Sequence, residues 1–289
     1  MNYSKDDFLD FDFHASSSEG QVDAKTIFEA FVECKKSLEH VPKKFRDKSF
    51  NLSMHRLMRE SLKSGKDGVK LFRKKADAKE STSLYWLARV KEAAYFFEAW
   101  REMPSFEPID SDFLNDFARL SEEPSNIKNV ENILADRGII VVHEKSIPGM
   151  KIDGACFLMD TGRPVIAMSL RYARLDIYWF VLMHELSHVV LHYDHLIHPI
   201  LDDIDDMAVE EIEIEANALA AKSLIPRNLW RSANVKYDAS EAEVFALARE
   251  ARTHPAIVVG RLQRETGKHN IFSNIINSEN SRKIIFGHE

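Results

Sequence analysis

The sequence predicts an α+β fold that is mainly helical, with a small antiparallel sheet packed on one buried helix. The segment 176–192, DIYWFVLMHELSHVVLH, is apolar on nearly every side, so as a helix it must be buried almost all round. Three short runs between residues 139 and 169 are typical of strands. Helical periodicity over most of the remaining chain predicts helices on both sides of these strands, including an extra helical region before them.

The composition is that of a globular chain without membrane spans. The chain has 289 residues, 45% hydrophobic and 10% aromatic, which is enough for a full core and long enough for two domains. No uncharged apolar run reaches the roughly 18 residues that a membrane span needs. The first twenty residues lack the basic and apolar regions of a signal peptide. Cys34 and Cys156 are too few for a disulfide framework, so we expect a cytoplasmic protein.

We expect four parts: an acidic mobile tail (1–20), a helical and partly basic N-terminal region (21–120), a core (121–232) and a C-terminal helical extension (233–289). The tail has phenylalanines among aspartates, and the alternative to mobility is an arm that occupies a groove on this protein or a partner. Residues 41–91 hold fifteen lysines and arginines against five acidic residues, about +10 in a chain of net charge −7. Such a region permits nucleic-acid binding, but a solvated basic face or a dock for the acidic tail is at least as well supported.

Spacing and breaking residues predict the individual elements. Amphipathic patterns predict helices over 23–41 and 84–100, and the aromatic stripe of the latter is more typical of a core face than of a ligand site. A helix over 127–136 is expected to end at Gly138. The later elements are a strand at 139–144, a hairpin of 152–158 and 164–169 around the turn DTGR, a short helix near 229 and a helix over 240–252. The segment PAIVVGRLQRE follows, and we expect these last elements to pack on the core or on a partner.

The buried helix carries an HExxH pattern. At about 100° per residue, His184 and His188 lie one turn apart on one face and can both point a ring nitrogen at one Zn²⁺. Glu185 is placed to reach a metal-bound water and to take its proton. The five-residue pattern also occurs by chance in helices without metal, where the two histidines simply form hydrogen bonds.

A catalytic zinc needs a third protein ligand, and the sequence favours a glutamate on a second helix. One known pattern, that of the metzincins, has Gly three residues and a third His six residues after the second histidine. This pattern is absent, because Leu191 and Asp194 occupy those two positions. His192 lies further along the same helix, and three ligands in a row cannot enclose a tetrahedral ion. In the next helix, Glu215 is expected nearest the apolar face and therefore buried against a cation. An exposed acidic face accounts for its neighbours, Glu210, Glu211 and Glu213.

Several motifs between residues 152 and 264 resemble, in order, those of the ImmA/IrrE family of bacterial zinc metallo-endopeptidases. They are a hairpin ending in PVIAMS, a D-x-x-W-F-x-x-x-H-E-x-x-H helix, EIEANALAAKSLIP and HPAIVVGRLQRE. The resemblance implies a zincin-like fold, zinc bound by His184, His188 and Glu215, and Glu185 as the general base. Ser187 departs from the glycine or alanine usual in the family, but serine is small enough to keep the packing.

The same resemblance implies a protein substrate, typically a helix-turn-helix repressor or antitoxin-type regulator cleaved in stress or mobile-element regulation. Family members often carry a helix-turn-helix domain before the peptidase, and no convincing one is identified in the basic region here. An edge strand beside the metal could hold an extended peptide by β-augmentation, which presents a peptide bond to the attacking water.

The segment between the two ligand helices offers further candidates. Tyr193, His195 and His198 are candidate stabilisers of the transition state, although loops beside a metal are often simply polar. Arg171, Arg174 and Asp176 are expected to cap or brace the zinc helix instead.

The sequence therefore predicts a zinc-dependent endopeptidase in which Glu185 moves a proton from water to the leaving amine. One alternative is a DNA-binding, antitoxin-like regulator whose metal is structural or sensory. The other is a pseudoprotease that binds its partner without cutting it. The presence of Glu185 argues against a pseudoprotease, because a binding module needs no base.

Overall fold

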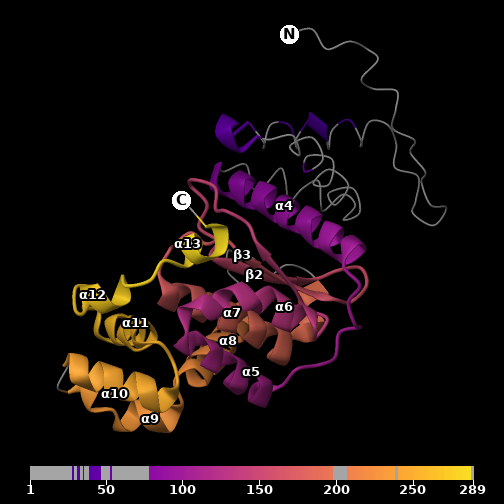
Figure 1. The fold of residues 1–289 in the computed structure, drawn as a ribbon. Coiled ribbons are helices and arrows are strands. Elements are labelled where there is room, and N and C mark those ends of the chain that lie inside the picture. The colour runs from indigo at the N-terminus through magenta and orange to yellow at the C-terminus, as the bar shows by residue number, and fades with distance from the viewer. Residues whose placement is uncertain are drawn as a thin grey trace.

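The computed structural model describes residues 28, 31, 32, 35, 39–46, 53, 78–197, 207–237 and 240–287 of the chain (Figure 1). The predicted acidic tail, most of the predicted helix 23–41, most of the basic region and His198 lie outside the described residues. No helix in the described part is long and apolar enough to cross a membrane.

The sheet contains the three strands that the sequence predicts. They are β1 (Ile140–His143), β2 (Gly154–Leu158) and β3 (Pro164–Met168), in the order β1-β3-β2. Strands β2 and β3 form the expected antiparallel hairpin, with Gly154 opposite Met168. Strand β1 pairs with the other edge of β3 in parallel, so the α+β class is confirmed but the sheet is mixed, not antiparallel. The central strand β3 thus runs parallel to β1 and antiparallel to β2.

Each face of the sheet packs on a helix. Helix α4 (Ala78–Trp100) covers one face, and α7 (Leu175–Leu191) lies on the other with α8 (Met207–Leu224) beyond it (Figure 1). Alternating side chains of the strands supply both cores: Val165 and Phe157 point toward α4, whereas Ile166 and Cys156 point toward α7. Helix α4 belongs to the predicted N-terminal region, yet it completes the core of the sheet.

The remaining elements are shorter helices, most of them on the α7 side of the sheet, while η2 packs with α4. The α-helices are α5 (Ser111–Ala118), α6 (Val130–Ala135), α9 (Arg227–Ser232), α10 (Glu241–Ala251), α11 (Pro255–Thr266), α12 (Ser273–Ile276) and α13 (Ser281–Phe286). Short 3-10 helices are η2 (Lys43–Phe45), η3 (Arg119–Glu122), η4 (Pro124–Asn129), η5 (Tyr193–Ile197) and η6 (Asn234–Lys236). The helix expected over 127–136 is thus divided between η4 and α6, and it ends before Gly138, whose φ of 75° suits glycine.

The C-terminal segment has a structural role that the sequence did not indicate. In α13, the backbone N–H of Ser281 donates to the carbonyl of Ala173 at 2.8 Å, and the side chain of Arg282 donates to the carbonyls of Leu170 and Arg171. These bonds fix the backbone that leads into α7. The last residues of the described chain therefore help to position the helix that carries the HExxH pattern.

Candidate metal centre

Helix α7 is buried on most sides, as its composition predicts. Trp179, Leu182 and Met183 have no exposed surface, and the rest of the helix packs in the same core. At its start, Arg174 donates two hydrogen bonds to Asp176, at 2.9 and 2.8 Å. This pair braces the first turn as expected, and Asp176 also favours the positive end of the helix dipole.

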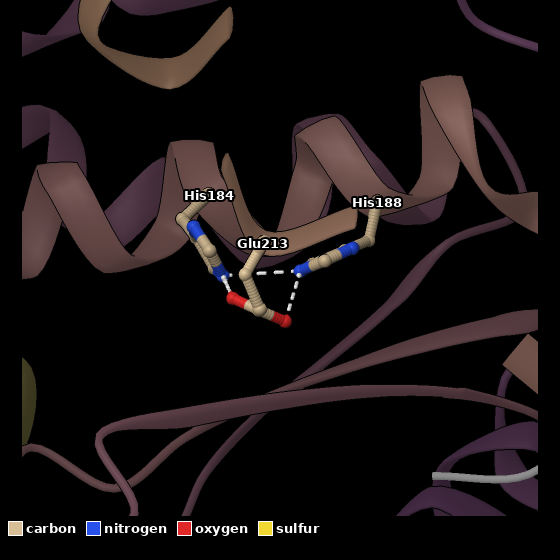
Figure 2. A group of neighbouring side chains, drawn as sticks. All are labelled: His184, His188 and Glu213. Atoms are coloured by element: carbon tan, nitrogen blue, oxygen red, sulfur yellow. Dashed lines mark hydrogen bonds and ion pairs between the residues drawn. The ribbon is translucent and has the colours of Figure 1, made fainter. Parts of the chain in front are cut away.

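Three side chains meet between α7 and α8 (Figure 2). His184 Nε2 lies 3.0 Å from one carboxylate oxygen of Glu213, and His188 Nε2 lies 3.2 Å from the other. The two ring nitrogens are 3.0 Å apart, and the ligand atoms of all three residues lie within 4.8 Å of one another. Ligands at the 2.0–2.1 Å typical of zinc would be about 3.3 Å apart around a tetrahedral ion. The donor set and its spacing therefore fit a zinc ion.

The structure places Glu213, not the expected Glu215, beside the two histidines. Glu213 precedes Ala216 by three residues and Ala220 by seven, and both alanines are fully buried, so all three share one face of α8. Glu215 is rotated by about 100° from Ala216 and its side chain is 56% exposed, compared with 22% for Glu213. The sequence estimate of the apolar face included Ile212 and Leu219, which are only half-buried, and this moved the centre of the face away from Glu213.

The charges at this cluster suit metal binding. Burial alone would raise the pKa of Glu213, but hydrogen bonds from His184 and His188 outweigh it and lower this pKa to about 2. Burial lowers the pKa of His188, while its hydrogen bond to Glu213 opposes the change. At neutral pH, therefore, the carboxylate is ionised and the His188 ring is neutral, which are the forms that bind a metal.

Glu185 lies between α7 and the first residue of β2. It is 6% exposed, and a Cβ at Gly154 would press on its Oε1 atom and lie 2.7 Å from a methyl of Val181. Behind it, burial raises the pKa of the Cys156 thiol, and the charge of Glu185 raises it further. The absence of a side chain at residue 154 thus creates the space that the Glu185 carboxylate occupies.

A cleft of about 690 Å³ opens over this cluster. Its floor contains His184, Glu185, His188 and Glu213, and one wall is the start of β2 from Asp153 to Cys156. Strand β2 is an edge strand, because the order of the sheet is β1-β3-β2.

Helix α11 also lines the cleft. There, the Arg264 guanidinium stacks over the Phe180 ring at 3.9 Å, one turn before His184. Burial lowers the pKa of this arginine, and the neighbouring charge of Arg261 adds to the effect. Phe180 and Arg264 thus place an apolar ring and a cation beside His184 and His188.

Two of the three loop candidates do not line the cleft. Tyr193 donates its hydroxyl proton to the carbonyl of Gly162 in the β2–β3 turn, and its ring stacks on Phe106 at 5.2 Å. His195 is exposed, and its ring packs edge-on at 6.4 Å from that of His192. Both residues stabilise the segment after α7, so neither is placed to touch a substrate carbonyl.

Sequence reasoning missed Glu213, Gly154 and His192 as parts of the site. A signal existed for Gly154, since a glycine at the start of a strand often marks a close approach of another group. None existed for Glu213, because four glutamates lie on the first turns of α8 and spacing alone cannot choose among them.

The comparison with known families agrees with the position of this site. Residues 135–263 match the family model of the IrrE N-terminal-like domain, Peptidase_M78. The match extends from the end of α6 to α11, and so includes α7, β2 and the Glu213 region of α8. A search of the curated proteins found no match.

Proposed function

Because this chain belongs to the ImmA/IrrE family through its IrrE N-terminal-like domain at residues 135–263, we propose that it is a zinc-dependent endopeptidase. The family assignment makes it a metallopeptidase-family protein. The observation that carries the finer proposal is the convergence of His184, His188 and Glu213 at the floor of an open cleft, with Glu185 beside them.

His184, His188 and Glu213 would hold the metal. When bound, zinc would act as a Lewis acid toward a peptide carbonyl and lower the pKa of water. These residues would supply three ligands, and the cleft above them would give a water molecule or a substrate access to the bound metal. Two neutral imidazoles and one carboxylate are the ligand set of other catalytic zinc sites, whereas structural sites are closed by four protein ligands.

Glu185 is the proposed general base and acid. Glu185 follows His184 directly on α7, and its carboxylate packs closely against β2 at Gly154. It takes a proton from the attacking water and then gives it to the amine of the departing peptide segment. General acid–base catalysis of this kind contributes roughly 10²–10⁴-fold to a rate.

The edge of β2 supports a peptide substrate. Because β2 is an edge strand that borders the cleft, an extended segment can pair with it and lay its backbone across the floor. The proposal includes the substrate class that the resemblance implies, a helix-turn-helix repressor or antitoxin-type regulator cleaved in the cytoplasm during stress or mobile-element regulation.

Zinc content and cleavage test this proposal together. We expect about one zinc per chain in the purified protein and in Glu185→Gln, and little in Glu213→Ala. Mapping of new protein N-termini in cells of the source species should find cleavage with the wild type and none with Glu185→Gln. A wild-type protein that contains no zinc even after reconstitution would contradict the proposed zinc-dependent endopeptidase function. Zinc at one per chain with no cleaved protein favours the pseudoprotease or the metal-sensing regulator, and salt-dependent DNA binding would then identify the latter.

A further inference from the structure

We infer that His192 and Glu215 form a relay that orients the metal ligand His188, an inference that rests on the proposed metal site. His192 is the first residue after α7 and is 6% exposed. Its Nδ1 atom lies 3.2 Å from Nδ1 of His188, and its Nε2 atom lies 2.9 Å from a carboxylate oxygen of Glu215. Glu215 thus contacts the site through His192 and not as a metal ligand.

In the metal-bound state, the chemistry of Glu215, His192 and His188 assigns the proton of each hydrogen bond in the relay. The carboxylate of Glu215 can only accept, so His192 must donate its Nε2–H to it. The Nδ1 atom of neutral His192 is then an acceptor, and His188 donates its own Nδ1–H to it. Where a metal takes the place of the hydrogen bond between His188 and Glu213, this leaves the lone pair of His188 on Nε2, the atom that faces His184 and Glu213. One carboxylate on α8 therefore selects the tautomer in which His188 can bind a metal.

The geometry also explains why the relay includes a second histidine. His188 is 2% exposed on α7, whereas Glu215 lies on the partly exposed side of α8, out of direct reach of the His188 ring. His192 is one helical turn after His188 and spans the gap between them. Helix α8 then contacts both ring nitrogens of His188, directly through Glu213 and indirectly through Glu215. Removal of a residue that orients a metal ligand through a hydrogen bond typically weakens metal binding 10- to 100-fold.

Zinc affinity, measured on the full chain by competition with a chromophoric chelator, tests the relay without an activity assay. We expect Glu215→Ala and His192→Phe to bind zinc roughly tenfold more weakly than the wild type. Glu211→Ala, an exposed glutamate one turn earlier on α8, is the matched control and should bind zinc like the wild type. Glu213→Ala should lose stoichiometric zinc, because it removes a ligand.

Two further measurements separate positioning from a merely structural role. Thermal unfolding in excess chelator should give the same midpoint for Glu215→Ala and Glu211→Ala. Nitrogen-15 spectra of the imidazole rings of the zinc-loaded protein should report the Nε2–H tautomer for His192, and Glu215→Ala should lose this single tautomer. Rescue of affinity by Glu215→Gln should be only partial, since an amide oxygen accepts the bond without the charge.

The outcomes are distinct. Glu215→Ala and His192→Phe that bind zinc as tightly as Glu211→Ala overturn the relay and leave the proposed function standing. Loss of all zinc in Glu215→Ala, with zinc retained in Glu213→Ala, also overturns it, because Glu215 would then be the ligand. A fall in affinity matched by an equal loss of stability in excess chelator assigns His192 and Glu215 to the fold alone. A wild type without zinc overturns the proposed function and the relay with it.

Discussion

Under the proposed function, the substitution Gly154→Ala should slow peptide cleavage without lowering zinc binding. Residue 154 begins β2 directly beneath the Glu185 carboxylate. A Cβ there would press on Oε1 of Glu185, lie 3.0 Å from its carboxyl carbon and lie 2.7 Å from a methyl of Val181. Gly154 does not have a positive φ, so the backbone itself accepts alanine and only the contact changes.

The size of the effect follows from these contacts. Carbon atoms do not approach closer than about 3.4 Å without strain, so the carboxyl carbon of Glu185 must move by at least about 0.4 Å, and its Oε1 atom, on which the Cβ would press, must move further. A general base has to stay within 2.6–3.2 Å of the proton that it takes, and a misplacement of about 1 Å can cost roughly 10²-fold in rate. The added methyl should also cost about 1–3 kcal/mol of stability through overpacking. The three atoms nearest the new methyl belong to Glu185 and Val181, and not to His184, His188 or Glu213, so zinc affinity should be unchanged.

The assay is the rate of cleavage of a protein trapped by Glu185→Gln, with zinc per chain and the thermal midpoint measured in parallel. Glu185→Asp provides the matched background, because its shorter side chain leaves room for the methyl. In a double-mutant cycle, Gly154→Ala should cost about 10²-fold in the wild type and much less in the Glu185→Asp background. Equal costs in both backgrounds, or a wild-type rate in Gly154→Ala, would refute the reasoning that Gly154 positions the base.

Three further predictions concern the rest of the chain. Burial lowers the pKa of His254 against the opposing charges of Glu279 and Glu123, and its Nδ1 accepts the N–H of Ala256 at the start of α11. Because its pKa is lowered in the folded state, neutral His254 contributes stability above pH 6.5, and this contribution is lost as the pH falls below 6.5. Between pH 7.5 and 5.5, the free energy of unfolding in urea should therefore fall less for His254→Asn than for the wild type. In a Cys34→Ser variant, the buried Cys156, whose thiol pKa is raised, should resist a thiol reagent at pH 8 until urea unfolds the chain; rapid labelling would contradict its burial. Arg282→Ala removes donors to the carbonyls of Leu170 and Arg171 and should cost about 1–3 kcal/mol in urea unfolding; an unchanged midpoint would show that α13 does not brace α7.

Local patterns predicted the elements that build the site. The apolar run of α7, the turn DTGR between β2 and β3, and Gly138 after α6 each act over a few residues, and the structure has them where they were expected. Helix α5 was missed although Asp110 caps it, with its carboxylate accepting the N–H of Phe113 at 2.8 Å. With eight residues, this helix is too short for a clear periodic signal.

Long-range relations were harder to predict. The parallel direction of β1 depends on which edge of β3 remains open after the hairpin forms, and no residue in β1 encodes that. The contacts of α13 join residues 281 and 282 to residues 170–173, and polar side chains at such a separation show no pattern in one sequence.

The difference between Glu213 and Glu215 has a physical cause. The sequence argument looked for the most buried carboxylate, and Glu213 is the more buried of the two, but the argument placed the centre of the apolar face of α8 nearer Glu215. The residue that does lie on the buried face is found only when Ala216 and Ala220 define that face, and their burial depends on how closely α8 approaches α7.

That approach also determines how the fold should respond to metal removal. Ala216 and Ala220 are fully buried where α8 meets α7, and small side chains let two helix axes lie close together. Leu182, Leu186, Ala220 and Leu224 belong to one apolar core, so burial of apolar surface holds the two helices together. Zinc would add about 4 kcal/mol at a thousandfold excess over its Kd. Chelation should therefore lower the unfolding midpoint while leaving the helical circular dichroism intact. A chain that loses its helices on chelation would show that the metal, and not this core, joins α7 to α8.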